Sequence, residues 1–146
     1  MKVSVVGVGR IKENHLRLAC EDYLGRIARY CKVSEIEVKD GSDLRKGLAP
    51  DTTCVALEVR GASYTSQQFS KKLQHWGRQG KGNIAFLIGG ATGIPPEISR
   101  SCQETLSLST MTLPHRLARI FLLEQIYRGF SLLRGEPYAR EDEATR

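Results

Sequence analysis

Two short segments in the last third of the chain carry the residues best suited to bind a small molecule. The first, Gly89–Gly93, follows the apolar run Ile84–Ile88, and glycines at such a place let the backbone approach a ligand closely. The second runs from Leu108 to His115 and combines hydroxyl and apolar side chains ahead of a proline. Its free amides and apolar floor suit an adenine ring, and His115 could serve as an acid, a base or a phosphate contact. A tight turn and a structural helix-terminal histidine remain the alternative interpretations.

Several other kinds of site are disfavoured by spacing. The glycine segment lacks the G-x-G-x-x-G pattern of dinucleotide sites and the lysine of a P-loop. It also comes late in the chain, and no phosphate-binding turn follows the first apolar run, so a flavodoxin-like nucleotide binder is disfavoured. The four cysteines form no C-x-x-C pair and have no histidine at a zinc-like interval, so we predict no metal site.

The elements that must position the two segments alternate between strands and helices. We predict strands over Lys2–Val8, Val33–Val38, Thr53–Val59, Asn83–Ile88 and Thr105–Leu108. Helices are predicted over Asn14–Cys31, Thr65–Gln79, from Pro95 or Pro96 to about Cys102, and over Pro114–Leu133. This alternation predicts one α/β domain over residues 1–146 with a parallel sheet, ending in a partly flexible tail over 136–146. Ligands in such folds bind beyond the carboxyl ends of the strands, which directs attention to the loops after Val59, Ile88 and Leu108.

Composition and charge indicate the compartment in which the protein works and the kind of partner that it binds. With 40% hydrophobic residues and no apolar stretch near the eighteen that a membrane span needs, the chain has a globular composition. The N-terminal apolar run is too short for a signal peptide, so we expect a cytoplasmic protein without membrane partners. The formal net charge of +6 modestly favours a polyanionic partner.

The last predicted helix is apolar on nearly every face. A helix of this kind is buried on more than one side. In a domain of this size a subunit interface is the expected second cover, so we predict a two-fold symmetric homodimer. The basic residues of the same helix are interpreted as a solvated face: Arg116, Arg119 and Arg128.

The segments together resemble a known family. The runs that carry the resemblance are Leu87-Ile88-Gly89-Gly90-x-x-Gly93, Leu106-Ser107-Leu108-Ser109-x-x-Thr112-Leu113-Pro114-His115, Gln125-x-Tyr127-Arg128 and Pro137-Tyr138. From Met1 to about Arg140 the chain resembles the RlmH family, which are SPOUT-class methyltransferases. That family modifies N3 of a pseudouridine in large-subunit ribosomal RNA.

The resemblance implies a fold, a cofactor and an assembly. It implies an α/β knot of the SPOUT type with a C-terminal trefoil knot, S-adenosyl-L-methionine bound in the knot, and a homodimer whose sites borrow the partner's C-terminal tail. It implies ribosomal RNA on the ribosome as the substrate. The cofactor contacts carried over by motif are Leu57, Gly89, Leu108, Ser109, Thr110, Met111, Thr112 and Leu113.

The residues that would hold the methyl-accepting base of the RNA are predicted less directly. As a hypothesis, His115 and Arg140 orient the acceptor and stabilise its charge, while Tyr138 closes the site from the other subunit. Candidates for contacts to RNA phosphates are Arg26, Arg29 and Lys32. One residue departs from the family pattern, because Ala139 stands where many members have a histidine after Pro-Tyr. This departure keeps two alternatives open, a nonenzymatic RNA-binding protein of the same fold and a methyltransferase that acts on another RNA.

Overall fold

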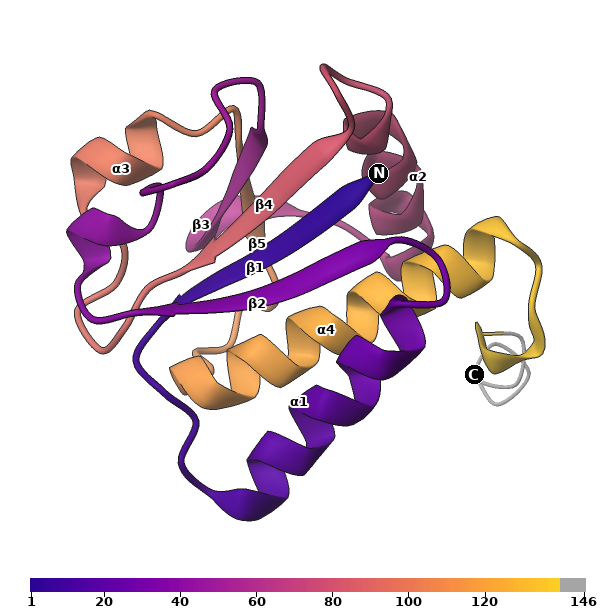
Figure 1. Cartoon of the computed structure of the whole chain (residues 1–146), viewed down its shortest axis with the longest axis horizontal. Coiled ribbons are helices and arrows are strands. Elements are labelled where there is room, and N and C mark those ends of the chain that lie inside the picture. The colour runs from indigo at the N-terminus through magenta and orange to yellow at the C-terminus, as the bar shows by residue number, and fades with distance from the viewer. Residues whose placement is uncertain (140–146) are drawn as a thin grey trace.

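Five parallel strands form one sheet with helices on both faces (Figure 1). The computed structural model describes residues 1–139. The strands are β1 (Lys2–Val8), β2 (Lys32–Val38), β3 (Thr53–Ser63), β4 (Asn83–Ile88) and β5 (Glu104–Ser107), in the order β2-β1-β4-β3-β5. The helices are α1 (Asn14–Ile27), α2 (Ser66–Gly77), α3 (Pro96–Arg100) and α4 (His115–Leu133), with a 3-10 turn over Gly41–Asp43.

Local sequence explains where these elements form. The central strand β4 is an unbroken apolar run because both of its faces are covered, and residues Ile84–Ile88 are all buried. The edge strand β2 carries the charged residues Glu35 and Glu37, as expected for a strand paired on one side only. Helix α2 begins with a capping box, in which Thr65 and Gln68 each accept a hydrogen bond from the other's backbone N–H.

Each face of the sheet has its own core. Helices α1, α2 and α4 pack together on one face, where Val5 and Phe86 of the sheet meet Leu73 and Leu122 of the helices (Figure 1). Helix α3 and the connection that follows β2 cover the other face. The carboxyl ends of β3, β4 and β5 are therefore fixed from both sides, and the loops that leave them start from rigid positions.

The predicted α/β fold with a parallel sheet is confirmed, and the trefoil knot stays a prediction. Two element boundaries differ from the prediction by four residues, and the others by no more than two. Helix α1 ends at Ile27 rather than Cys31, because Tyr30 and Cys31 belong to a turn that leads directly into β2. Strand β3 continues four residues beyond Val59 to Ser63. Within residues 1–139, no helix is long and apolar enough to cross a membrane.

Candidate functional site

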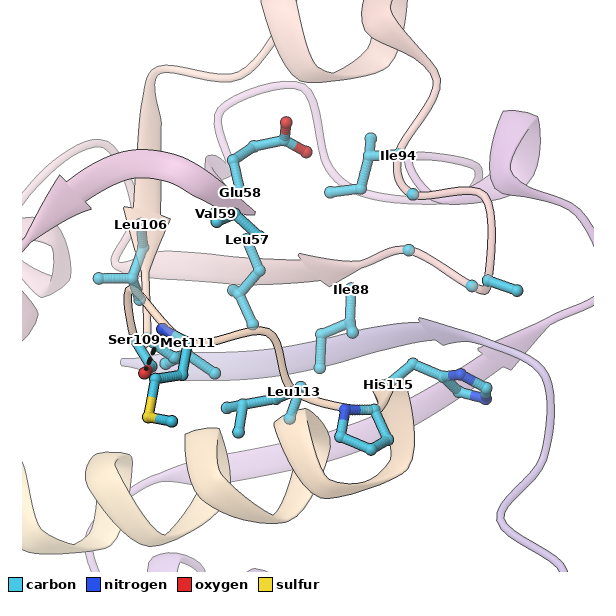
Figure 2. A pocket seen from close by; sticks show the side chains of 17 residues that line it. Leu57, Glu58, Val59, Ile88, Ile94, Leu106, Ser109, Met111, Leu113 and His115 are labelled. Atoms are coloured by element: carbon cyan, nitrogen blue, oxygen red, sulfur yellow. Dashed lines mark hydrogen bonds between the residues drawn. The ribbon is translucent and has the colours of Figure 1, made fainter.

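A cavity of about 310 Å³ lies at the carboxyl ends of β3, β4 and β5 (Figure 2). The loop after β4, the loop after β5 and the first turn of α4 enclose it. Its lining is mostly apolar and comprises Leu57, Glu58, Val59, Ile88, Gly89, Gly90, Ala91, Gly93, Ile94, Leu106, Leu108, Ser109, Met111, Leu113, Pro114, His115 and Ala118. The two segments that the sequence singled out, Gly89–Gly93 and Leu108–His115, thus meet across one pocket.

An irregularity in β3 shapes one wall of this pocket. Strand β3 pairs with β5 as far as Leu57, leaves the ladder, and resumes at Ala62, so that Leu57 and Ala62 both lie opposite Leu106. The bulge re-aims the intervening side chains, and Glu58 and Val59 line the cavity. A Cβ atom at Gly61 would lie 2.8 Å from the Leu106 backbone, so only glycine allows β3 to return this close to β5.

The glycine loop after β4 folds back on itself. Gly90 and Gly93 form an isolated antiparallel bridge, and the N–H of Gly93 donates to the carbonyl of Gly90 at 3.0 Å. A Cβ atom at Gly89 would lie 2.4 Å from the carbonyl carbon of Gly93, a distance that no side chain tolerates. Glycine at position 89 is therefore required by the loop itself, and the same bare backbone faces the cavity.

Serine side chains hold the start of the loop after β5. The Ser107 hydroxyl donates to the carbonyl of Ser109 at 3.1 Å, and the Ser109 Oγ accepts from the N–H of Met111 at 2.9 Å (Figure 2). These bonds are local turn interactions of the kind that serine forms with a nearby backbone. They keep Leu108 and Ser109 against the cavity while the Met111 side chain is 76% exposed.

The predicted cofactor residues fall into two groups in the structure. Leu57, Gly89, Leu108, Ser109, Met111 and Leu113 all line the cavity. Thr110 and Thr112 lie in the same loop but are exposed and do not line it.

The predicted acceptor-side residues are not brought together within one chain. His115 is the first residue of α4 and lines the cavity. Tyr138 folds back along α4, where its hydroxyl donates to Glu124 Oε2 at 2.7 Å and its ring contacts Tyr127. Since each helical residue rises 1.5 Å, Glu124 lies about 14 Å along the helix from His115 and about 9 Å from Ala118, the lining residue of α4 nearest to it. Arg140 lies outside the described residues.

The pocket contains one acidic residue that the sequence did not single out. Glu58 was predicted only as part of a strand, and the structure puts its half-buried side chain in the lining. Burial raises the pKa of its carboxyl group above the usual value. The signal that could have found it is its position directly after Leu57, at the carboxyl end of a predicted strand.

An ion pair positions the start of α4 next to the loop that follows β1. Arg116 Nη1 lies 2.6 Å and 2.7 Å from the two carboxylate oxygens of Glu13. The Arg116 guanidinium also holds the pKa of the partly exposed Glu13 carboxyl below its usual value. The contact joins residues more than a hundred positions apart at the rim of the site.

A buried arginine anchors the same helix to the sheet. Arg119 is only 1% exposed, and its Nη1 donates to Glu37 Oε2 at 2.8 Å and to Glu35 Oε2 at 3.1 Å. Its Nη2 donates to the carbonyl of Gly9 at 3.0 Å. The sequence prediction of a solvated face was therefore wrong for Arg119, because the glutamates of β2 supply ion-pair partners that the helix pattern cannot reveal.

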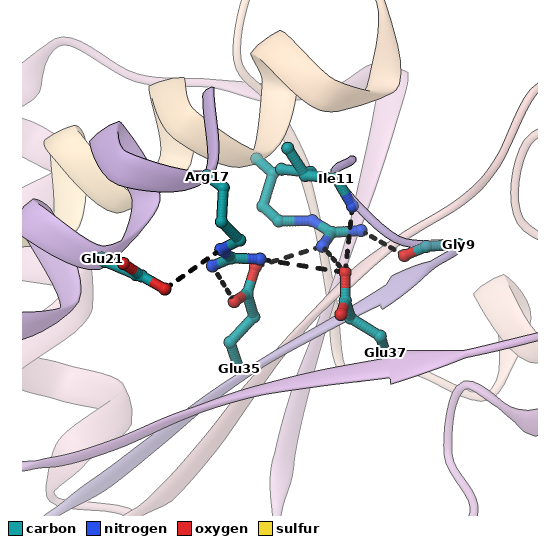
Figure 3. A network of polar contacts seen from close by, with 7 residues as sticks. Gly9, Ile11, Arg17, Glu21, Glu35 and Glu37 are labelled. Atoms are coloured by element: carbon teal, nitrogen blue, oxygen red, sulfur yellow. Dashed lines mark hydrogen bonds and ion pairs between the residues drawn. The ribbon is translucent and has the colours of Figure 1, made fainter. Parts of the chain in front are cut away.

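The network extends beyond this arginine to α1. Arg17 pairs with Glu35 and also approaches Glu37 at 4.0 Å, while Glu37 accepts the N–H of Ile11 at 3.2 Å (Figure 3). Four elements thus share one cluster of charges: α1, β2, α4 and the loop after β1. The cluster fixes the first turns of α4, and therefore His115, relative to the sheet.

None of the four cysteines forms a disulfide. Within residues 1–139, no group of three or more side chains could hold a metal ion. Cys54 of β3 shares a hydrogen bond with Cys102, which lowers the pKa of the Cys54 thiol and raises that of Cys102. Neither cysteine lines the cavity.

Comparison with known proteins agrees with this geometry. Residues 1–139 match the family model described as "Predicted SPOUT methyltransferase". The chain is 46% identical over 144 residues to the "Ribosomal RNA large subunit methyltransferase H" of Sorangium cellulosum, covering 95% of this chain and 99% of that relative. It is 40% identical over 157 residues to the protein of the same name from Clostridium kluyveri, covering 94% and 99% respectively.

Solved structures of low sequence identity share the fold. A probable methylase family protein from Haemophilus influenzae matches with a TM-score of 0.55 at 11% identity, over 91% of this chain and 66% of that one. TrmJ from Z. mobilis ZM4 matches with a TM-score of 0.55 at 12% identity, over 88% of this chain and 70% of that one. Because the family model matches all of residues 1–139, this protein belongs to the SPOUT methyltransferase family.

Proposed function

We propose that this protein transfers a methyl group from S-adenosyl-L-methionine to N3 of a pseudouridine in large-subunit ribosomal RNA, on the ribosome. The observation that carries the proposal is the apolar pocket between the loops after β4 and β5, in a chain of this family. The names of the relatives from Sorangium and Clostridium support the choice of ribosomal RNA as substrate.

The pocket has the properties that this cofactor needs. Its volume of about 310 Å³ is at the lower end of the usual range for small-molecule sites. Leu57, Ile88 and Leu108 supply apolar surface for a purine ring, and the bare backbone of Gly89 leaves room for close approach. The proposed cofactor contacts are therefore Leu57, Gly89, Leu108, Ser109, Met111 and Leu113, with Thr110 and Thr112 contributing only through the conformation of their loop.

Methyl transfer requires two contributions from the protein, alignment of the acceptor nitrogen and removal of its proton. The bound cofactor supplies an electrophilic methyl group, so the protein has to hold the acceptor nitrogen in line with it. The proton on that imide nitrogen must also leave, which a base or a nearby positive charge assists. His115 is proposed for this role because it is the one basic residue within residues 1–139 that lines the pocket.

Arg140 and Tyr138 are proposed to act from the partner subunit. Within its own chain the Tyr138 side chain lies beside Glu124, about 14 Å along α4 from His115, so it does not reach its own pocket. A two-fold dimer would let the tail of each chain meet the other chain's pocket. The Tyr138 hydroxyl stays protonated near neutrality, because burial and the Glu124 carboxylate both raise its pKa, so its role is to donate a hydrogen bond.

An exposed apolar face supports the proposed homodimer. Leu117 and Phe121 of α4 are 46% and 39% exposed, large values for apolar helix residues. Together with Tyr23, Leu113 and Ile120 they line a shallow hollow on the side of α4 next to the pocket loop. Apolar residues gathered on one face commonly mark an interface, and this one adjoins both the pocket and the Tyr138 contact to Glu124.

The three cations proposed for RNA phosphates are not equivalent. Arg26 is paired with Asp22 at 3.1 Å, whereas Arg29 and Lys32 line a separate hollow beside the start of β2. Arg29 and Lys32 are therefore the stronger candidates. A ribosomal substrate also implies a cytoplasmic location.

Calorimetry combined with transfer assays tests this proposal. S-adenosyl-L-methionine is expected to bind the wild-type protein, and His115→Ala and Tyr138→Phe are expected to keep that binding while losing methyl transfer. If both variants retain full transfer, the roles assigned to His115 and Tyr138 are wrong. Absence of cofactor binding by the wild-type protein would favour the nonenzymatic RNA-binding alternative. Parallel assays on assembled ribosomes, free ribosomal RNA and tRNA would identify a different RNA substrate.

A further inference from the structure

The bulge in β3 exposes one carboxylate to the cofactor pocket. Glu58 follows Leu57 directly, at the point where β3 leaves its ladder with β5. Figure 2 shows its side chain near Ile94 at one side of the cavity, with Leu113 and His115 at the other. An acidic side chain in an otherwise apolar wall needs a reason, because transferring a charge out of water is costly.

Nothing within residues 1–139 neutralises this carboxylate. It forms no hydrogen bond or ion pair there, and burial is the sole cause that raises its pKa. The other acidic residues near the site are already engaged, since Glu13 binds Arg116, and Glu35 and Glu37 bind Arg119. The Glu58 carboxylate is therefore available to a ligand that is not part of the described chain.

The charge balance of the pocket indicates what that partner is. Among the lining residues of the described chain, Glu58 is the only one that can carry a negative charge. The methyl donor has a positively charged sulfonium, and the product left after transfer has a neutral thioether at the same place. A carboxylate in the wall favours the first over the second, and the effect is stronger in a partly desolvated pocket than in water.

We infer that Glu58 is a specificity residue that makes the pocket prefer the sulfonium cofactor over its neutral demethylated product. This inference rests on the proposed function and adds to it a selectivity for the charge state of the ligand. The benefit is that the product, present in the cell beside the donor, competes less and leaves more readily once the charge has disappeared. The residue contributes through its charge, without taking part in proton transfer.

The test compares ligand affinities by calorimetry on the intact chain. S-Adenosyl-L-methionine and S-adenosylhomocysteine are titrated into the wild-type protein and into Glu58→Gln, which keeps the shape and removes the charge. The ratio of the two affinities is expected to fall by about tenfold in Glu58→Gln, mainly through weaker binding of the sulfonium ligand. Sinefungin, which carries an amine near the position of the sulfonium, should follow the charged ligand.

Two control variants separate charge at this position from general effects. Glu58→Asp keeps the charge and is expected to retain most of the preference. Glu97→Gln removes an exposed carboxylate from α3 outside the lining and should leave the ratio within about twofold of wild type, because exposed charges at a distance are screened.

The outcomes distinguish this inference from the proposal beneath it. Binding of both ligands with an unchanged ratio in Glu58→Gln overturns the inference alone. An equal loss of both ligands also overturns it, because that result indicates a contact to a group that donor and product share. If the wild-type protein binds neither ligand, the proposed function fails and the inference fails with it.

Discussion

Replacing Arg119 with methionine tests whether the buried charge cluster holds α4 in place. The guanidinium is 1% exposed and links Glu35, Glu37 and the carbonyl of Gly9. Methionine has a similar length, so the variant preserves most of the packing and removes the charge and its hydrogen bonds. The carboxylates and the carbonyl are then left facing an apolar side chain.

The structure sets the size of the expected effect. Removing one partner of a buried ion pair typically costs about 3–5 kcal/mol. The side chains of Glu35 and Glu37 are 10% and 27% exposed, and Arg17 still pairs with Glu35, so part of the charge remains compensated. We therefore expect the free energy of unfolding to fall by about 3 kcal/mol, at the lower end of that range. Adding Glu37→Gln to Arg119→Met should recover about 1 kcal/mol, because one uncompensated charge is removed.

Urea denaturation followed by circular dichroism, at one fixed protein concentration, measures these differences. Arg29→Met provides the matched control, since Arg29 is exposed and the same substitution there should change the free energy of unfolding by less than about 0.5 kcal/mol. The reasoning is refuted if Arg119→Met costs less than about 1 kcal/mol, or if the added Glu37→Gln makes the protein less stable still.

Three further predictions concern the tail, the exposed face and alkaline stability. Tyr138→Phe removes the hydrogen bond to Glu124 and should lower the free energy of unfolding by about 1 kcal/mol in urea titrations; an unchanged value contradicts that bond. Phe121→Glu puts a charge on the exposed apolar face and should produce a monomer in sedimentation velocity, whereas a persisting dimer would rule out this face as the interface. Burial and the hydrogen bond to Glu136 raise the pKa of Tyr30 from 10.0 to about 12, so the stability that protonated Tyr30 contributes is full below pH 10 and is lost as the pH rises toward 12. Tyr30→Phe should reduce that alkaline loss in pH-dependent urea titrations, and identical pH profiles for the two proteins would count against it.

The sheet could be predicted because its strands differ in burial. The apolar run Ile84–Ile88 identifies a strand covered on both faces, and β4 is indeed the middle strand. The glutamates of β2 identify a strand near the edge, where the structure has it. Both patterns follow from which side chains are in contact with water. The local sequence is therefore enough to predict the place of each strand in the sheet.

The bulge in β3 could not be predicted from the same patterns. Gly61 and the polar residues around it are typical of the end of a strand, which is why the predicted strand stopped at Val59. Strand β3 continues because its backbone returns to Leu106, a residue more than forty positions away. Glu58 lines the pocket through this long-range pairing, and the one local sign of it in the sequence is its position directly after Leu57, at the carboxyl end of a predicted strand.

Arg119 shows the same limit for side chains. Its position among other basic residues on α4 is typical of a solvated face, and Arg116 at the rim is indeed exposed. Arg119 differs because Glu35 and Glu37, more than eighty residues earlier, lie beneath it. A helix pattern specifies which residues share a face, and only the tertiary structure specifies what that face meets.

Methyl transfer to undermodified ribosomes tests the central claim most directly. Ribosomes from a strain that lacks the modification would be incubated with the protein and S-adenosyl-L-methionine labelled in its methyl group, and the RNA digested to nucleosides for mass spectrometry. We predict that the label appears in 3-methylpseudouridine from large-subunit RNA and is lost in His115→Ala, which should still bind the cofactor. Label in no nucleoside, or in a different nucleoside, would contradict the account.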